Sequence, residues 1–123
     1  MSRSEAMNLQ QLVENYMALW NEADAEKRRA GIASLYAPDG VQYTPQNEYR
    51  GYEALEVRVS GAYEQFVNKG GFLFQLASEV QEHHGGVTFT WKMVPAAGGG
   101  VAGSGTIFWL LNENSRIIYD YHF

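Results

Sequence analysis

The sequence predicts an α+β fold in which a strongly curved, cone-shaped antiparallel sheet wraps around three N-terminal helices. Two observations support this prediction. Apolar residues recur at helical spacing in three segments before Gly70, and from Phe72 onward they recur at every second position. Because the helices precede the long strands, we expect them to lie together on one face of the sheet. The open end of such a cone is a natural place for a small-molecule pocket.

Three segments have the apolar spacing of helices that bury one face. Residues 1–6, before the first of them, are expected to fray. Asp24 is a good N-cap for the second segment, because its side chain can accept hydrogen bonds from the first turn. Gly70 and Gly71 end the third, since glycine adopts the left-handed conformation common after helices. The predicted helices cover about residues 7–21, 25–36 and 52–68.

The sheet is expected to come mainly from the second half of the chain, where apolar and polar residues alternate. A hairpin turn is predicted at residues 83–86 and a flexible loop at residues 95–100, both of which contain glycines. Residues 46–49 are predicted to form a polar loop after Pro45. The predicted strands cover about residues 41–44, 72–81, 87–93, 103–111 and 116–123.

The last predicted strand carries an acid and an imidazole two residues apart. Side chains alternate across a strand, so Ile118, Asp120 and His122 are expected to share one face. Such a pair can converge on a small molecule in a pocket, or it can meet solvent on the outer face of the sheet. The opposite face is expected to carry Ile117, Tyr119, Tyr121 and Phe123.

Length and composition limit the classes of function that the chain can have. The 123 residues fit one domain spanning 1–123, and 14% aromatic residues can form the stiff walls of a cavity. A net charge of −5 without a basic cluster argues against nucleic acid and anionic membranes as partners. No signal-peptide pattern and no apolar run of membrane-spanning length is present, so we expect a cytoplasmic protein.

The sequence also predicts that neither a metal nor an organic cofactor is needed. It has no cysteine, and therefore neither a disulfide, a thiol nucleophile nor a cysteine-based zinc site. His83 and His84 are adjacent in a turn, where their side chains are expected to diverge rather than bind one metal. The glycines at 98–100, 103 and 105 do not open a helix, which argues against a phosphate-binding loop.

Four stretches in a fixed order resemble one protein family: Tyr16 to Trp20, residues 32–41, residues 50–55, and the hairpin from Trp109 to Ile117. Together they resemble the nuclear-transport-factor-2-like superfamily, in its SnoaL-like, polyketide-cyclase-type branch. The resemblance implies a curved sheet around helices, a deep pocket and dimers packed through the sheet. The superfamily includes steroid isomerases, dehydratases, epoxide hydrolases, cyclases and binding proteins without catalytic activity, so the fold alone does not specify the function.

The resemblance implies specific roles for some residues. Tyr16 matches the oxyanion-donating tyrosine of steroid isomerases, but Tyr43 and Thr44 stand where those enzymes have an aspartate base. Their second oxyanion donor falls on or near Ile107, so steroid isomerase activity is not expected. No Asp-Arg-Asp set of the epoxide-hydrolase type is found. The cyclase-like branch often places an acid and a histidine at alternate positions facing the pocket, as Asp120 and His122 do here.

Two functional hypotheses follow. In the first, the protein is a cofactor-free acid/base enzyme of cyclase, isomerase or dehydratase type that acts on a small hydrophobic ring or polyketide-like molecule. Asp120 and His122 exchange protons, and Tyr16 stabilises the developing oxygen charge. In the second, it is a non-catalytic module for ligand binding or dimerisation. A homodimer through the outer face of the sheet is expected in both. The predicted ligand-binding residues are Trp20, Tyr43, Tyr52, Tyr63, Phe66, Ile107 and Trp109.

Overall fold

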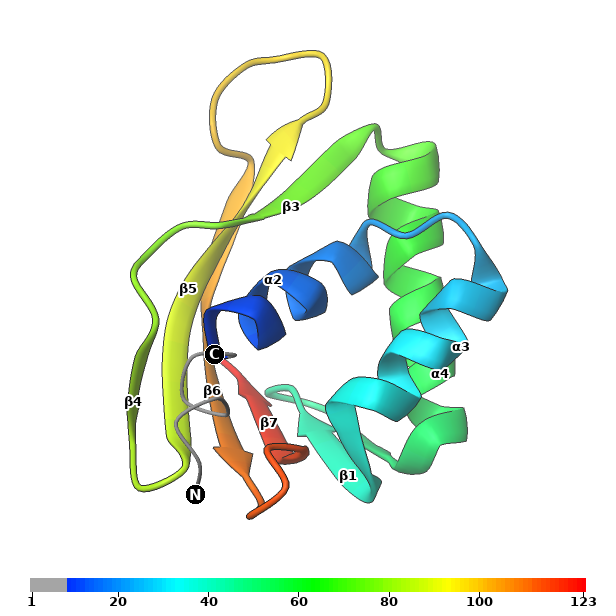
Figure 1. Ribbon diagram of the computed structural model, residues 1–123. Helices are drawn as coiled ribbons and strands as arrows, with labels where there is room; N and C mark the ends of the chain where they lie inside the picture. Colours follow the sequence, from blue (N-terminus) through cyan, green and yellow to red (C-terminus); the bar gives the residue numbers. More distant parts are fainter. Residues whose placement is uncertain (1–8) are drawn as a thin grey trace.

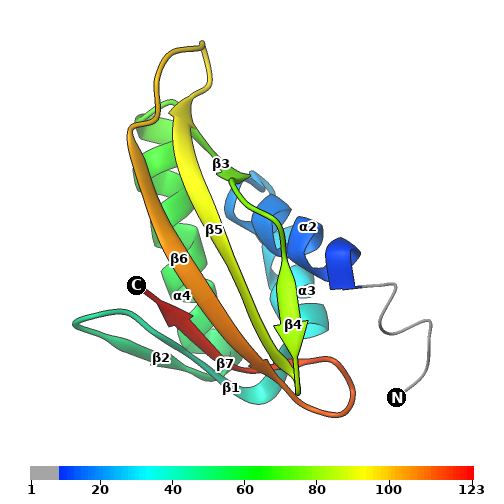
Figure 2. The same ribbon diagram turned by 90° about the vertical axis from the view of Figure 1, so that its left-hand side faces the viewer.

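Three helices pack against one face of a curved, seven-stranded sheet in the computed structural model, which describes residues 9–123 (Figure 1). Turning the molecule by 90° shows the long strands in front and all three helices behind them (Figure 2). The α+β fold class predicted from the change of period is therefore confirmed. The segment 1–6, predicted to fray, and the first two residues of the predicted helix 7–21 lie outside the described residues.

The helices begin and end where local signals place them. α2 (Leu9–Trp20) and α3 (Ala25–Leu35) are joined by a short turn. The Asp24 side chain accepts hydrogen bonds from the backbone N–H groups of Glu26 and Lys27, which confirms the predicted N-cap of α3. α4 (Gly51–Ala62) continues as the π-helix η1 (Tyr63–Lys69), and the chain then turns at Gly71 with a positive φ of 73°.

The sheet is mixed rather than purely antiparallel. Its order is β2-β1-β7-β6-β5-β3, and β4 also pairs with β5. All these pairs are antiparallel except β1 with β7, which run parallel. A parallel pair needs a long crossover, and here everything between β1 and β7 serves as that connection. The strands are β1 (Tyr36–Tyr43), β2 (Glu48–Arg50), β3 (Phe72–Leu76), β4 (Gln81–His83), β5 (Gly86–Pro95), β6 (Gly103–Leu111) and β7 (Ile117–His122).

Three strand boundaries differ from the sequence prediction. β1 begins at Tyr36 rather than at Val41, with an irregular register up to Val41. Glu48 and Tyr49, predicted to lie in a polar loop, instead belong to the edge strand β2 (Glu48–Arg50), which pairs with β1. The predicted strand 72–81 is divided into β3 and β4, because the intervening residues leave the ladder while Ser78 Oγ accepts a hydrogen bond from Thr90 N.

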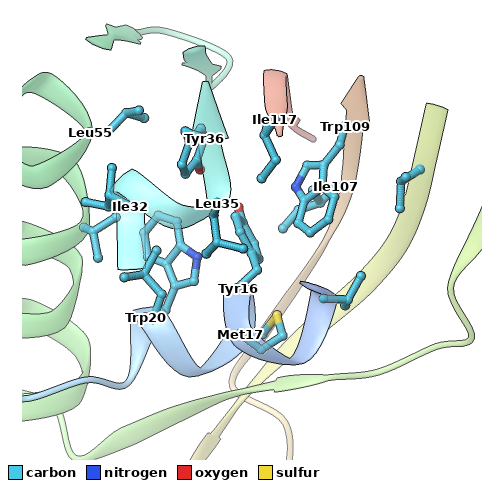
Figure 3. Close-up of a cluster of buried hydrophobic side chains, with 14 of the residues drawn as sticks. Tyr16, Met17, Trp20, Ile32, Leu35, Tyr36, Leu55, Ile107, Trp109 and Ile117 are labelled. Atoms are coloured by element: carbon cyan, nitrogen blue, oxygen red, sulfur yellow. The ribbon is translucent and has the colours of Figure 1, made fainter. Parts of the chain in front are cut away.

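The core lies between the helices and the concave face of the sheet. Figure 3 shows Tyr16 reaching from α2 toward Trp109 on β6, with Ile107 on the same strand. The Tyr16 and Trp109 rings meet edge to face with centroids 4.9 Å apart, and Phe89 packs on Trp109 at 5.1 Å. Such pairs contribute about 0.5–1.5 kcal/mol beyond the burial of their area. These contacts fix α2 against the centre of the sheet.

A β-bulge changes the face of one residue on the last strand. Leu110 pairs with Tyr119 and Leu111 pairs with Ile117, so Ile118 is the extra residue. Ile117 is consequently buried in the core on the same side as Asp120, whereas simple alternation assigned it to the face of Tyr119. Beyond the bulge, alternation holds. Asp120 is fully buried, and Tyr119 and Tyr121 are exposed on the opposite face.

Candidate functional site

A cavity of about 300 Å³ lies between the helices and the concave face of the sheet. Phenylalanine, tyrosine and tryptophan side chains form half of its wall, and three chemistry-bearing groups come from different elements: the phenol of Tyr16 on α2, the guanidinium of Arg58 on α4 and the imidazole of His122 on β7. Pockets that hold small ligands share this composition of an apolar wall with few polar groups. The lining residues are Tyr16, Met17, Trp20, Arg58, Ala62, Phe66, Phe74, Trp91, Ile107 and His122.

Asp120 lies behind the wall of this cavity. Its side chain is 0% exposed, and its Oδ2 atom accepts hydrogen bonds from three donors. These donors are the hydroxyl of Tyr16 at 2.9 Å, the hydroxyl of Tyr36, and Nε2 of Gln42 at 3.3 Å. A buried carboxylate is stable only when such donors replace water. The network therefore holds a negative charge next to the cavity without exposing it.

His122 contacts the buried carboxylate of Asp120 and also lines the cavity. Its Nε2 atom lies 2.8 Å from Tyr16 Oη and 3.0 Å from Asp120 Oδ1. The contact with Oδ1 is an electrostatic one, because that oxygen has no aligned hydrogen bond within residues 9–123. The His122 side chain is 14% exposed and lines the cavity. Of the acid–imidazole pair, only the imidazole can touch a ligand directly.

The position of the protons follows from these contacts. Burial, and then the nearby Asp120, raise the pKa of Tyr16 well above its ordinary value, so its phenol stays protonated. Its single proton is donated to Asp120, and its oxygen can then accept the Nε2–H of His122. Nδ1 of His122 makes no hydrogen bond with residues 9–123 and so keeps a lone pair for a ligand.

This arrangement uses Tyr16 differently from the sequence hypothesis. There, the phenol was expected to donate a hydrogen bond to a substrate oxygen. In the structure its proton is donated to Asp120, and the hydroxyl of this fully buried residue contacts both the carboxylate and the imidazole. Tyr16 is therefore placed to orient His122. Its counterpart Tyr36 has a pKa raised for the same first reason, burial, followed by the charge of Asp120.

The predicted ligand-binding residues divide into two groups. Trp20, Phe66 and Ile107 line the cavity. The other four do not. Trp109 is buried in the core, Tyr52 donates a hydrogen bond to the Tyr36 carbonyl, Tyr63 packs under Arg28, and Tyr43 lies against Tyr119 and Tyr121. Aromatic residues at helical or alternating positions share one pattern whether they fill a core, a pocket or an outer face, so sequence spacing does not separate these roles.

Three site residues were not identified from the sequence. Gln42 and Tyr36 reach Asp120 because β1 pairs with β7, with Gln42 directly opposite Asp120. Arg58 lines the cavity and donates a hydrogen bond from Nε to Gln42 Oε1 at 2.8 Å. Their only sequence signal is a polar residue within an otherwise apolar periodic segment. Such a residue is equally compatible with an exposed position.

Neither a metal site nor a membrane span emerges from the part of the chain that the structure describes. Residues 9–123 contain no group of three or more side chains positioned to bind one metal ion. None of the helices in that range is both long and apolar enough to cross a bilayer.

The geometry can be compared with known proteins. A family model described as a SnoaL-like domain matches residues 13–119. A solved structure of a candidate isomerase of the SnoaL-like family from Agrobacterium tumefaciens is similar, with a TM-score of 0.84 and 25% identity over 95% of this chain and 97% of that chain. No curated protein matches the sequence significantly.

Two more distant structures show the fold alone. A candidate polyketide cyclase from Sinorhizobium meliloti has a TM-score of 0.69 at 14% identity, covering 95% of this chain and 97% of that chain. A nuclear-transport-factor-2-like protein from Exiguobacterium has a TM-score of 0.67 at 20% identity, covering 90% and 95%.

Proposed function

The chain belongs to the family of SnoaL-like domains, and on that premise we propose that it is a cofactor-independent acid/base enzyme of cyclase, isomerase or dehydratase type. Its substrate is a small hydrophobic ring or polyketide-like compound bound in the cavity. One observation carries the proposal: the His122 imidazole reaches the cavity while its Nε2 lies 3.0 Å from the fully buried Asp120 carboxylate. A base that reaches the cavity beside a shielded anion is suited to take a proton from carbon, because the anion stabilises the cation that forms.

In the proposed reaction, Nδ1 of His122 takes a proton from a carbon next to a carbonyl group. The C–H electron pair becomes the enolate, and the imidazole becomes a cation. The negative charge of Asp120 stabilises that cation, and Tyr16 keeps the ring in place through Nε2. Returning the proton to a different atom completes an isomerisation. Attack of the enolate carbon on a second carbonyl carbon completes a cyclisation, after which the proton passes to the new alkoxide.

The proposal is tested by proton exchange at carbon, which needs no knowledge of the natural substrate. Cyclic enones and 1,3-dicarbonyl compounds are incubated with the protein in D₂O, and α-deuterium incorporation is followed by NMR. His122→Gln should reduce the exchange rate by about 10²–10⁴-fold, the usual contribution of a positioned general base. His83→Gln is the matched control, because it removes an imidazole from the exposed end of β4.

One outcome of the exchange assay would contradict the acid/base proposal. If wild-type protein accelerates exchange in none of these compounds beyond the His122→Gln variant, the acid/base proposal fails. The alternative is then a non-catalytic ligand-binding module of the same fold. The predominantly apolar wall of the cavity favours that alternative, because binding alone requires no titratable group inside.

We also propose that the protein forms a homodimer through the outer face of the sheet. Tyr43 and Phe108 flank Tyr121 on adjacent strands of that face, with ring centroids 5.0 Å and 6.1 Å from it. Tyr121 is 36% exposed and Phe123 is 75% exposed. A contiguous aromatic surface of this kind is typical of an interaction site. Its two-fold-symmetric pairing with a second copy would cover both surfaces at once. Analytical ultracentrifugation that finds only monomer at micromolar concentration would refute this proposal.

A further inference from the structure

A single arginine carries permanent charge in the wall of the cavity among the described residues. Arg58 is half-buried, and its guanidinium carbon lies 5.5 Å from the ring centroids of both Trp20 and Tyr49. Its Nε donates a hydrogen bond to Gln42 Oε1 at 2.8 Å. Within residues 9–123 the two terminal Nη atoms make neither a hydrogen bond nor an ion pair. Four N–H donors are therefore left for a ligand.

The environment of Arg58 differs from that of the surface arginines. Arg29 pairs with Glu26 and Glu56, and Arg50 pairs with Glu48. Arg58 instead contacts two aromatic faces and one neutral amide, and that amide, Gln42, separates it from the buried Asp120 carboxylate. Cation–π contacts offset part of the cost of placing a cation among apolar walls. The Arg58 guanidinium lines the cavity and, among the described residues, has no carboxylate in direct contact with it.

A local cation matters because the protein as a whole repels anions. With a net charge of −5, it does not attract a negatively charged molecule by its general field. A guanidinium, however, presents parallel N–H groups that match the two oxygens of a carboxylate. An Nη pair in an apolar cavity therefore selects ligands with such a group.

Resting on the proposed function, we propose that the cavity binds a small ring compound that carries a carboxylate, and that the Nη atoms of Arg58 bind this carboxylate. The ring of the ligand lies along Trp20, whose indole is 5.5 Å from the Arg58 guanidinium and 5.9 Å from the His122 imidazole. One ligand can thus contact the guanidinium with its acid group and the imidazole with its reacting carbon. A cavity of about 300 Å³ restricts the ligand to one or two rings.

The proposal is tested by comparing an acid with its neutral isostere. 2-Naphthoate and 2-naphthamide, and the smaller pair benzoate and benzamide, are titrated into wild-type protein by isothermal calorimetry at pH 7.5. In at least one pair, the acid should bind at least tenfold more tightly than the amide. Arg58→Met should abolish that preference while leaving the affinity for the amide within threefold. Arg116→Met is the matched control, since it removes one exposed arginine outside the cavity and should preserve the preference.

Two more variants identify the group that binds the acid. Arg58→Lys keeps the charge but loses the planar pair of donors, and it should lower the preference at least threefold. If Arg58→Met does not fold, the acid-over-amide preference of Arg58→Lys tests the proposal in its place. His122→Gln should keep the preference. If the preference is lost in His122→Gln and kept in Arg58→Met, the imidazole binds the acid and the proposal is wrong.

Wild-type protein alone can also overturn the proposal. It fails if neither acid binds more tightly than its amide, or if neither pair binds at millimolar concentration. It fails too if Arg58→Met weakens acid and amide equally, since the arginine would then only support the wall. These are binding measurements, so they are separate from the exchange assay. Proton exchange in neutral ketones without acid selectivity would refute this inference and leave the proposed function standing.

Discussion

Two adjacent rows of side chains cross the centre of the sheet and face opposite ways. The inner row runs through Gln42, Asp120 and Trp109, which are paired across β1, β7 and β6 and are each 0% exposed. The outer row is one residue further along, and its exposed members are Tyr121 and Phe108. Acid and amide are thus buried, while large aromatic rings face out.

Burying an acid and an amide while exposing aromatic rings is the opposite of the usual arrangement of a half-buried sheet, in which apolar side chains face the core and polar ones face solvent. A buried carboxylate is costly and an exposed aromatic surface favours association, so each row carries a feature that stability of the isolated chain does not explain. The difference teaches that the two faces of one strand serve two purposes. We propose that the inner face supports the site in the cavity and that the outer face binds a second copy of the chain.

The largest effect is expected on the inner row. Asp120→Asn preserves shape but removes the charge that Tyr16, Tyr36 and Gln42 bind. It should lower the free energy of unfolding by about 3 kcal/mol, because buried donors lose their anionic acceptor. Urea denaturation followed by circular dichroism measures this. A loss below about 1 kcal/mol would mean that the network contributes little to stability and would weaken the contrast between the rows.

On the outer row, charge should affect association instead of folding. Tyr121→Glu places two like charges near a two-fold axis and should raise the dimer dissociation constant at least about 30-fold, or 2 kcal/mol. The control is Val57→Glu, which adds the same charge at an exposed apolar residue of α4. Sedimentation equilibrium measures both variants. Equal association in both would show that the outer row is not the interface.

Removing one hydroxyl from each row gives a matched comparison. Tyr36→Phe deletes a donor to the buried carboxylate and should cost about 1.5 kcal/mol of stability. Tyr121→Phe deletes a hydroxyl on the exposed face and should stay within about 0.5 kcal/mol of wild type. Chemical denaturation of both variants under identical conditions measures the difference. Equal losses would contradict the assignment of energetic importance to the inner row.

The last comparison concerns how one substitution changes the pH dependence of stability. The pKa values of Tyr16 and Tyr36 are raised in the folded state above their ordinary value of 10.0, first by burial and then by Asp120. The folded state therefore holds these protons more tightly than the unfolded chain. The contribution of this shift to stability is fully present well below pH 10 and is lost as the pH rises through 10, by about 1 kcal/mol for each tyrosine between pH 10 and 11. Tyr36→Phe should make this fall less steep in melts between pH 10 and 11, and an unchanged slope would contradict the raised pKa.

Several features of this protein followed from short stretches of sequence. The Asp24 cap, the turn at Gly71 and the alternation along β6 depend on local backbone preferences, which neighbouring residues determine. For the same reason, the shared face of Asp120 and His122 was predictable: side chains alternate along any strand. The bulge at Ile118 placed Ile117 in the core instead of on the predicted face of Tyr119, and it left the face of Asp120 and His122 as predicted.

Tertiary structure decided which groups surround that pair and what reaches the cavity. Gln42 meets Asp120 across 78 positions of sequence, through the parallel pairing of β1 with β7 that the antiparallel prediction lacked. Arg58 enters the cavity because α4 packs beside β1, where Gln42 holds its Nε. Local patterns specify period and turns, but the register of distant strands and the covered face of a helix depend on packing of the whole chain. The acid–imidazole pair was therefore visible in the sequence, and the network that buries its charge was not.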